Sequence, residues 1–187
     1  MNSIDTTISV SAINVDGVSV PLVGGSGENK FAQVIDRTVT EITTEDFEGA
    51  TKVGTYAFYF CRNLKSVTIP NGVTSIEDHA FSICSSLTEV AIPDSVKSIG
   101  GQAFYNCTSL TSITIPDSVE TTGNLAFGGC IALTEITIKA TTPPTLSGTN
   151  AIPNNVTTIY IPTGTLSVYS TATNWSSFAD KFVEKDM

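Results

Sequence analysis

The sequence predicts a mainly β solenoid made of 23-residue coils and closed by a cap at each end. The first observation is an Ala-Phe pair that recurs four times, each 23 residues after the last. The second is a short alternation of apolar and polar residues that follows each pair and is typical of a strand. The third is that no 23-residue unit can bury its apolar side chains alone, so the units must stack. The pairs are Ala57-Phe58, Ala80-Phe81, Ala103-Phe104 and Ala126-Phe127.

Each coil carries its apolar residues at the same phase. A cysteine follows each Phe by three residues, and a leucine follows each cysteine by three. An alternating strand comes next, and in the first three coils it ends at a proline, which cannot donate to a β ladder. We therefore expect the Phe, Cys, Leu and alternate strand residues to point inward. The strands are Val67-Thr68-Ile69, Val90-Ala91-Ile92, Ile113-Thr114-Ile115 and Ile136-Thr137-Ile138.

One turn position is occupied by glycine in three coils, at Gly54, Gly100 and Gly123, and by Glu77 in the remaining one. Glycine is the residue that adopts positive φ without strain. We therefore expect a turn with positive φ at this position.

The pattern A-F-x-x-C-x-x-L-x-x-V-x-I-P-x-x-V-x-x-I over Val53 to Ile138 resembles the BspA-type leucine-rich repeat. The resemblance implies a right-handed coil of the α/β leucine-rich repeat type, with a parallel sheet on one face. It also implies a role in surface adhesion and protein recognition. Repeats of this kind are similar, too, to the decoration domains of bacteriophage tail proteins.

The flanks of the repeats predict the domain organisation. We assign residues 1–30 to an N-terminal arm and linker, 31–52 to an N-terminal cap with a degenerate repeat, and 53–138 to the solenoid. Residues 139–187 form a C-terminal strand and a cap of one or two short helices, because their aromatic residues fall at helical spacing.

Composition and charge exclude several function classes. The chain has 18 acidic and nine basic residues and a net charge of −9, which disfavours nucleic acid and anionic lipid as partners. No stretch approaches the ~20 apolar residues of a membrane span. The beginning of the chain lacks a positively charged leader and a continuous apolar run, so we expect no Sec-dependent signal peptide.

The cysteines and the single histidine do not predict catalysis. Cys61, Cys84, Cys107 and Cys130 share an inward phase and contain no C-x-x-C pair, so we expect buried free thiols rather than a metal site. A catalytic histidine needs a nucleophile and an orienting carboxylate beside it, and the sequence around His79 does not supply this set. We therefore expect His79 to be an ordinary surface residue of the solenoid. We therefore expect no enzyme activity, no cofactor and no metal.

The candidate partner-binding residues are apolar and aromatic side chains near the Ala-Phe-x-x-Cys segments of the first three coils. An exposed stripe of such residues usually marks a partner site, but the N-terminal arm could instead fold back over it. The residues are Tyr56, Tyr59, Phe60, His79, Ile83 and Tyr105.

Together these features favour a non-catalytic recognition or adhesion module that binds a protein or glycan. By resemblance, it would act on a bacterial surface or a phage virion. The alternative is a structural spacer or assembly protein that forms a homo-oligomer through its N-terminal arm.

Overall fold

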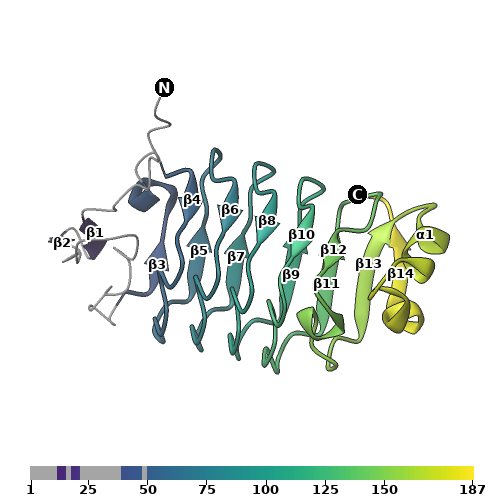
Figure 1. The fold of residues 1–187 in the computed structure, drawn as a ribbon. Coiled ribbons are helices and arrows are strands. Elements are labelled where there is room, and N and C mark those ends of the chain that lie inside the picture. Colours follow the sequence, from purple (N-terminus) through teal and green to yellow (C-terminus); the bar gives the residue numbers. More distant parts are fainter. Residues whose placement is uncertain (1–11, 16–17, 22–38, 48–49) are drawn as a thin grey trace.

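The structure is a computed structural model that describes residues 12–15, 18–21, 39–47 and 50–187. From residue 39 onward the chain winds into coils that stack side by side in an elongated body, with short helices at the C-terminal end (Figure 1). Within residues 39–187, the paired strands come from successive coils and run parallel. The prediction of a mainly β, repeat-type solenoid is therefore confirmed. Coils one to four are residues 52–74, 75–97, 98–120 and 121–144.

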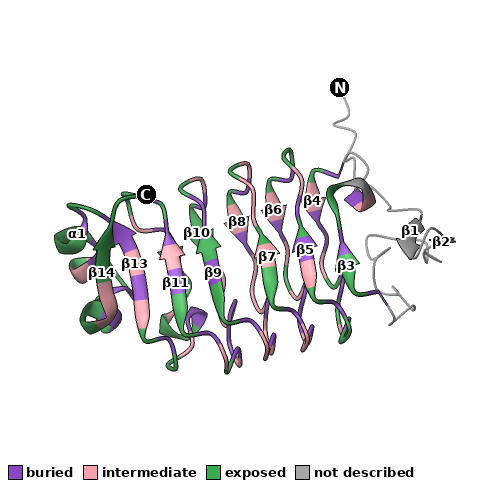
Figure 2. Ribbon diagram, turned by 180° about the vertical axis from the view of Figure 1, so that it is seen from behind, coloured by how far each residue is buried: buried purple, intermediate pink, exposed green. Residues whose placement is uncertain are grey.

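One face of the solenoid carries a continuous sheet of two-residue strands. In each of them the second residue is buried, which places it in the core. Figure 2 colours the described chain by burial. These strands are too short to show alternation in the sequence, so this second ladder was not predicted. They are β4 (Lys52–Val53), β6 (Ser75–Ile76), β8 (Ser98–Ile99), β10 (Thr121–Thr122) and β12 (Thr145–Leu146).

The opposite face carries the strands that the sequence predicts, together with one unpredicted strand at the C-terminal end. They form one three-stranded and one four-stranded sheet. In β9 and β11, the alternate Ile side chains point inward. The three-stranded sheet consists of β3 (Glu41–Ile42), β5 (Ser66–Thr68) and β7 (Glu89–Ala91). The four-stranded sheet consists of β9 (Ser112–Ile115), β11 (Glu135–Ile138), β13 (Thr158–Pro162) and β14 (Phe182–Lys185).

A seam separates β7 from β9, although coils two and three are neighbours. In the described structure, β7 pairs with β5 and β9 pairs with β11. No backbone ladder joins β7 to β9. Val90 and Ile92 beside this seam are only half-buried. On the opposite face β6 pairs with β8 without interruption. Coils two and three are therefore held together by the second sheet and by hydrogen bonds at the corners.

The core is built of residue columns that run along the solenoid axis. Phe58, Phe81, Phe104 and Phe127 stack with ring centroids 5.1, 5.3 and 5.5 Å apart and interplanar angles of 8° or less. The four cysteines form a second buried column, and all four are free thiols, as the sequence predicts. Cys84 donates its S–H to the Phe58 carbonyl oxygen, at 3.1 Å, and Cys107 and Cys130 repeat this bond one and two coils later.

The recurring glycine in the turns is explained by close approach of neighbouring backbones and not by a positive φ. Gly54, Gly100 and Gly123 do not have positive φ, so that prediction was wrong. A Cβ added to Gly100 would lie 2.6 Å from the backbone nitrogen of Asp78 in the preceding coil. Close approach of neighbouring coils therefore explains glycine at positions 100 and 123, whereas coil two accommodates Glu77 at the equivalent position.

Both ends of the repeat body carry additional elements. At the N-terminal end lies the short 3-10 helix η1 (Thr44–Phe47), and the backbone of β1, from the β1–β2 hairpin (Ala12–Val15 and Val18–Pro21), lies close to it. The remainder of the predicted arm lies outside the described residues.

The C-terminal cap is held to the last coils by two buried aromatic side chains. Tyr169 donates its hydroxyl to the Ala140 carbonyl oxygen at 2.7 Å, and Trp175 donates its indole N–H to the Pro144 carbonyl oxygen at 2.6 Å. The sequence predicts one or two short helices between residues 166 and 182, but neither the short helix at residues 149–151 nor the final strand, β14. No helix in the described part of the chain combines the length and apolarity that a membrane crossing requires. The helices are η2 (Thr149–Ala151), α1 (Leu166–Thr171) and η3 (Ser176–Lys181).

Candidate recognition surface

The predicted binding residues lie on the corner that links each two-residue strand to the next longer strand. Alternate backbone N–H groups of this corner donate to the following coil: Tyr56 to Asp78, Phe58 to Ala80, and Phe60 to Ser82, at 2.7 to 3.1 Å. The same bonds recur between coils two and three. Equivalent residues of successive coils are therefore held in register along the corner.

Two positions of each corner have left-handed backbone conformation. The first is filled by Tyr56, His79, Gln102 and Leu125, with φ between 55° and 60°. The second is filled by Phe60, Ile83, Asn106 and Gly129, with φ between 57° and 72°. Gly and Asn adopt this conformation readily, whereas a β-branched residue such as Ile is strained in it. At the second position, coils one and two thus place apolar side chains where coils three and four have Asn106 and Gly129, which suit the backbone; at the first position, coil four also has an apolar residue, Leu125.

The structure brings four of the six predicted residues into ring contact, and we call these four the aromatic patch. Tyr56 stacks on His79 of the next coil, with centroids 4.6 Å apart and planes 12° apart. Tyr59 contacts Tyr56 edge-on at 5.4 Å and Phe60 at 6.0 Å. Tyr56 and Tyr59 are 37% and 44% exposed, whereas Phe60 and His79 are half-buried. The patch therefore consists of two exposed rings in contact with two half-buried rings.

The other two predicted residues do not join this ring cluster. Ile83 lies half-buried at the left-handed position next to Phe60 along the corner. Tyr105 is separated from its equivalent, Tyr59, by the buried Ser82 of coil two. The Tyr105 ring lies close to Gly128 of coil four: a Cβ added to Gly128 would be 3.1 Å from Cδ2 of the ring. The expected stripe over three coils is thus concentrated in coils one and two.

Sequence reasoning missed Arg62, whose guanidinium lies over the Phe60 ring at 4.0 Å from the centroid. An Arg two residues after a corner aromatic is the available signal, but the contact depends on the side-chain conformations. A cation in this position gains from the negative face of the ring. The aromatic patch is therefore bounded at one end by an exposed positive charge.

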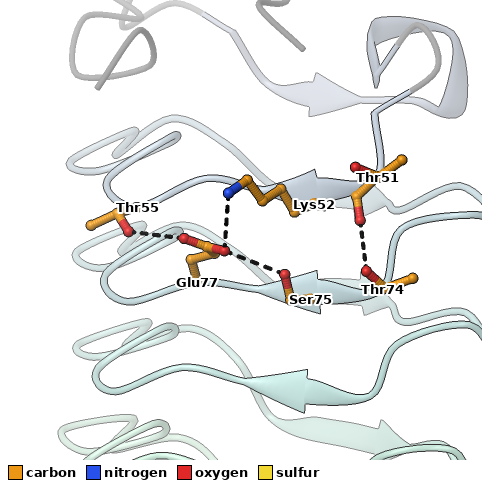
Figure 3. Close-up of polar contacts among 6 residues, drawn as sticks. All are labelled: Thr51, Lys52, Thr55, Thr74, Ser75 and Glu77. Carbon is orange, nitrogen blue, oxygen red and sulfur yellow. Dashed lines mark hydrogen bonds and ion pairs between the residues drawn. The ribbon is translucent and has the colours of Figure 1, made fainter. Parts of the chain in front are cut away.

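A set of polar contacts joins coils one and two where the corner begins (Figure 3). Glu77 accepts a hydrogen bond from Thr55 at 3.3 Å and forms an ion pair with Lys52 at 3.6 Å. It also accepts from Ser75 at 3.5 Å. Lys52 and Glu77 are partly exposed, so the pair adds little stability.

Two of the buried cysteine thiols have raised pKa values. No cluster of three or more metal-ligating side chains occurs among the described residues. A hydrogen bond with Cys61, together with burial, raises the pKa of the Cys84 thiol well above its usual value. A hydrogen bond with Cys130, together with burial, does the same for the pKa of Cys107. Both thiols are therefore protonated near neutral pH and are poor nucleophiles.

The strain at Ile83 leads to a testable expectation. Ile83→Asn should leave the free energy of unfolding unchanged or raise it by about 1 kcal/mol, because relief of left-handed strain offsets the lost apolar contact. Asn106 already occupies the equivalent position of coil three. Urea unfolding measures this change, and a loss above ~1 kcal/mol would show that the Ile83 side chain is needed for packing.

Comparison with protein families identifies the repeat. The family described as BspA type Leucine rich repeat region matches residues 51–177 in six copies. No curated protein matches the chain.

Two solved structures share the architecture. A leucine-rich repeat protein of T. pallidum, TpLRR, is 28% identical, with a TM-score of 0.53, over 67% of this chain and 54% of its own. The pneumococcal vaccine antigen PcpA is 18% identical, with a TM-score of 0.58, over 95% of this chain and 47% of its own. At that identity, the second match shows the fold alone. The chain spans about half the length of each of these structures.

Proposed function

Because the chain belongs to the BspA-type leucine-rich repeat family, we propose that it is a non-catalytic recognition module whose aromatic patch binds a protein or glycan partner. The family is typically non-enzymatic, and binding or adhesion is the role its repeats suggest. We propose adhesion or host recognition at the surface of a bacterium or a virion as the setting.

One observation carries the proposal: the strained left-handed residues Phe60 and Ile83 lie beside the exposed rings of Tyr56 and Tyr59. Strained backbone conformations cluster at functional sites, although Leu125 in coil four is a bulky left-handed residue outside the patch. Coils three and four, which lack exposed aromatic rings at this corner, have the relaxed choices Asn106 and Gly129. Tyr and Arg are also the residues that most often dominate binding energy at interfaces.

The outer faces of the strands offer a weaker surface. Thr68, Ala91 and Thr114 are exposed, but they are small and supply no large anchor. Small side chains contribute shape and hydrogen bonding rather than most of the binding energy. We therefore assign the partner site to the corner and not to the sheet.

The test is a double variant, Tyr59→Ser with Phe60→Asn, screened on an array of printed glycans and purified cell-surface proteins. Asn is chosen because it fits the left-handed position, as in coil three. Ligands that bind the unmodified chain should lose more than ~2 kcal/mol, about thirtyfold in affinity, with little change in the unfolding midpoint.

The matched control is Leu166→Ser with Val168→Ser, which removes two exposed apolar side chains of α1 at the other end of the solenoid. Its binding should equal that of the unmodified chain. Binding that survives in the patch variant would move the site to the flat sheet face. A chain that binds nothing on the array, and whose oligomer dissociates when residues 1–28 are deleted, would instead favour the spacer function.

A further inference from the structure

We propose, building on the recognition function above, that the aromatic patch binds an acidic peptide segment of a partner protein. Arg62 binds the carboxylate of this segment, and a neighbouring apolar side chain of the segment packs on Tyr59 and Phe60. The proposal names the class of partner and assigns a separate role to Arg62.

The first observation is the state of Arg62. Its guanidinium lies over the Phe60 ring, and its side chain is exposed. Arg62 forms no ion pair with any carboxylate in the described part of the chain. The ion pair found there joins Lys52 and Glu77. An Arg that lies on an aromatic ring keeps its N–H groups available for bidentate binding of a carboxylate. The Phe60 ring thus positions the Arg62 guanidinium, and no carboxylate among the described residues pairs with it.

The second observation is the local charge. The chain as a whole carries twice as many acidic as basic residues. Arg62 nevertheless lies in a stretch, residues 55–64, that contains no acid, and the facing residues 79–88 contain no acid either; Glu77 and Asp78 lie where the corner begins. The end of the corner that carries Arg62 is therefore positively charged, on a protein that is acidic as a whole. Charge complementarity of this kind selects the partner and fixes its orientation.

The third observation distinguishes a peptide from an acidic glycan. Ile83 and the Phe60 ring form the half-buried floor beside Arg62, and both side chains lack hydrogen-bonding groups. Sugar hydroxyls placed on this floor would lose water without gaining a partner. An aliphatic or aromatic side chain buries the same surface favourably. The combination of an apolar floor and one adjacent cation therefore fits a carboxylate next to an apolar residue.

The test is selection of phage-displayed random linear peptides on the immobilised full chain. Peptides with Asp or Glu adjacent to an aromatic or aliphatic residue should be enriched. A synthetic copy of the leading peptide should bind Arg62→Gln about tenfold or more weakly, because a hydrogen-bonded charge pair is lost. Lys65→Gln, which changes another exposed base of the same coil, is the matched control and should bind within about twofold of the unmodified chain. The affinity of Arg62→Lys should fall between those of Arg62→Gln and the unmodified chain. Lysine keeps the positive charge but cannot bind a carboxylate in the bidentate geometry of a guanidinium.

Each outcome decides a separate point. Enrichment of apolar residues without acids, or equal binding by Arg62→Gln, overturns the role of Arg62 and leaves the aromatic patch standing. Arg62-dependent binding of oligogalacturonate without peptide enrichment overturns the peptide in favour of an acidic glycan. A selection that enriches no peptide at all also overturns the proposal. If the Tyr59→Ser, Phe60→Asn variant binds the selected peptide as well as the unmodified chain does, the proposed function of the patch itself fails.

Discussion

Replacing Phe104 by alanine is expected to lower the free energy of unfolding by about 3–5 kcal/mol. Phe104 is fully buried, and its ring lies between those of Phe81 and Phe127 at 5.3 and 5.5 Å. Alanine would therefore interrupt the aromatic column in the middle of the solenoid. The coils on both sides are fixed by backbone ladders, so the cavity can collapse only partly.

Thr114→Ala provides the contrast, since Thr114 is exposed on the outward side of β9. It should cost well under ~1 kcal/mol in the same urea titration. Similar losses at the two positions would contradict the assignment of inward and outward residues. Binding at the aromatic patch should change little in Thr114→Ala, because coil three carries no part of the patch.

The interior of this fold was predictable because its buried residues recur every 23 residues along the repeats. The Phe, Cys and Leu columns recur at a fixed spacing, so an inward phase assigned in one coil applies in the others. Phe81, Cys84 and Leu87 are all fully buried, as predicted. The repeat signal also gave the family correctly, since the matched residues extend across most of the chain.

The corner was harder to predict, because its form depends on backbone conformation and on rotamers. Left-handed positions are usually recognised by Gly or Asn, and here Tyr56, Phe60 and Ile83 occupy them. The six candidate residues were identified from exposure and register, but the contacts that single out four of them are three-dimensional. The position of Arg62 on Phe60 is likewise a rotamer choice that spacing does not reveal.

The sheets show a similar limit of periodicity. A strand of two residues has no alternation to detect, which is why the ladder from β4 to β12 was not predicted. The seam between β7 and β9 follows repeats that look regular in sequence: Glu89-Val90-Ala91-Ile92-Pro93 is as strand-like as its neighbours. Nothing in the described residues explains the interruption.

Gly123→Ala is expected to destabilise the chain by about 1–3 kcal/mol or more, through overpacking between backbones. An added Cβ would lie 2.5 Å from the carbonyl carbon of Gly100 and even closer to the backbone nitrogen of Gly101. Backbone atoms cannot rotate away as a side chain can, so coils three and four would have to separate. The bond from the Gly123 N–H to the Ile99 carbonyl oxygen, now 2.8 Å, would lengthen with them.

Gly101→Ala is the matched control for this effect. Its added Cβ would approach the nearest atom, Asp78 Oδ1, only to 3.4 Å, and its φ is not in the left-handed region. It should therefore change the unfolding midpoint little, whereas Gly123→Ala should lower it clearly in the same titration. Equal midpoints for the two variants would mean that the coils can yield at this turn. The corner that carries the aromatic patch would then be less rigidly held than its hydrogen bonds imply, because the same turn leads into it in every coil.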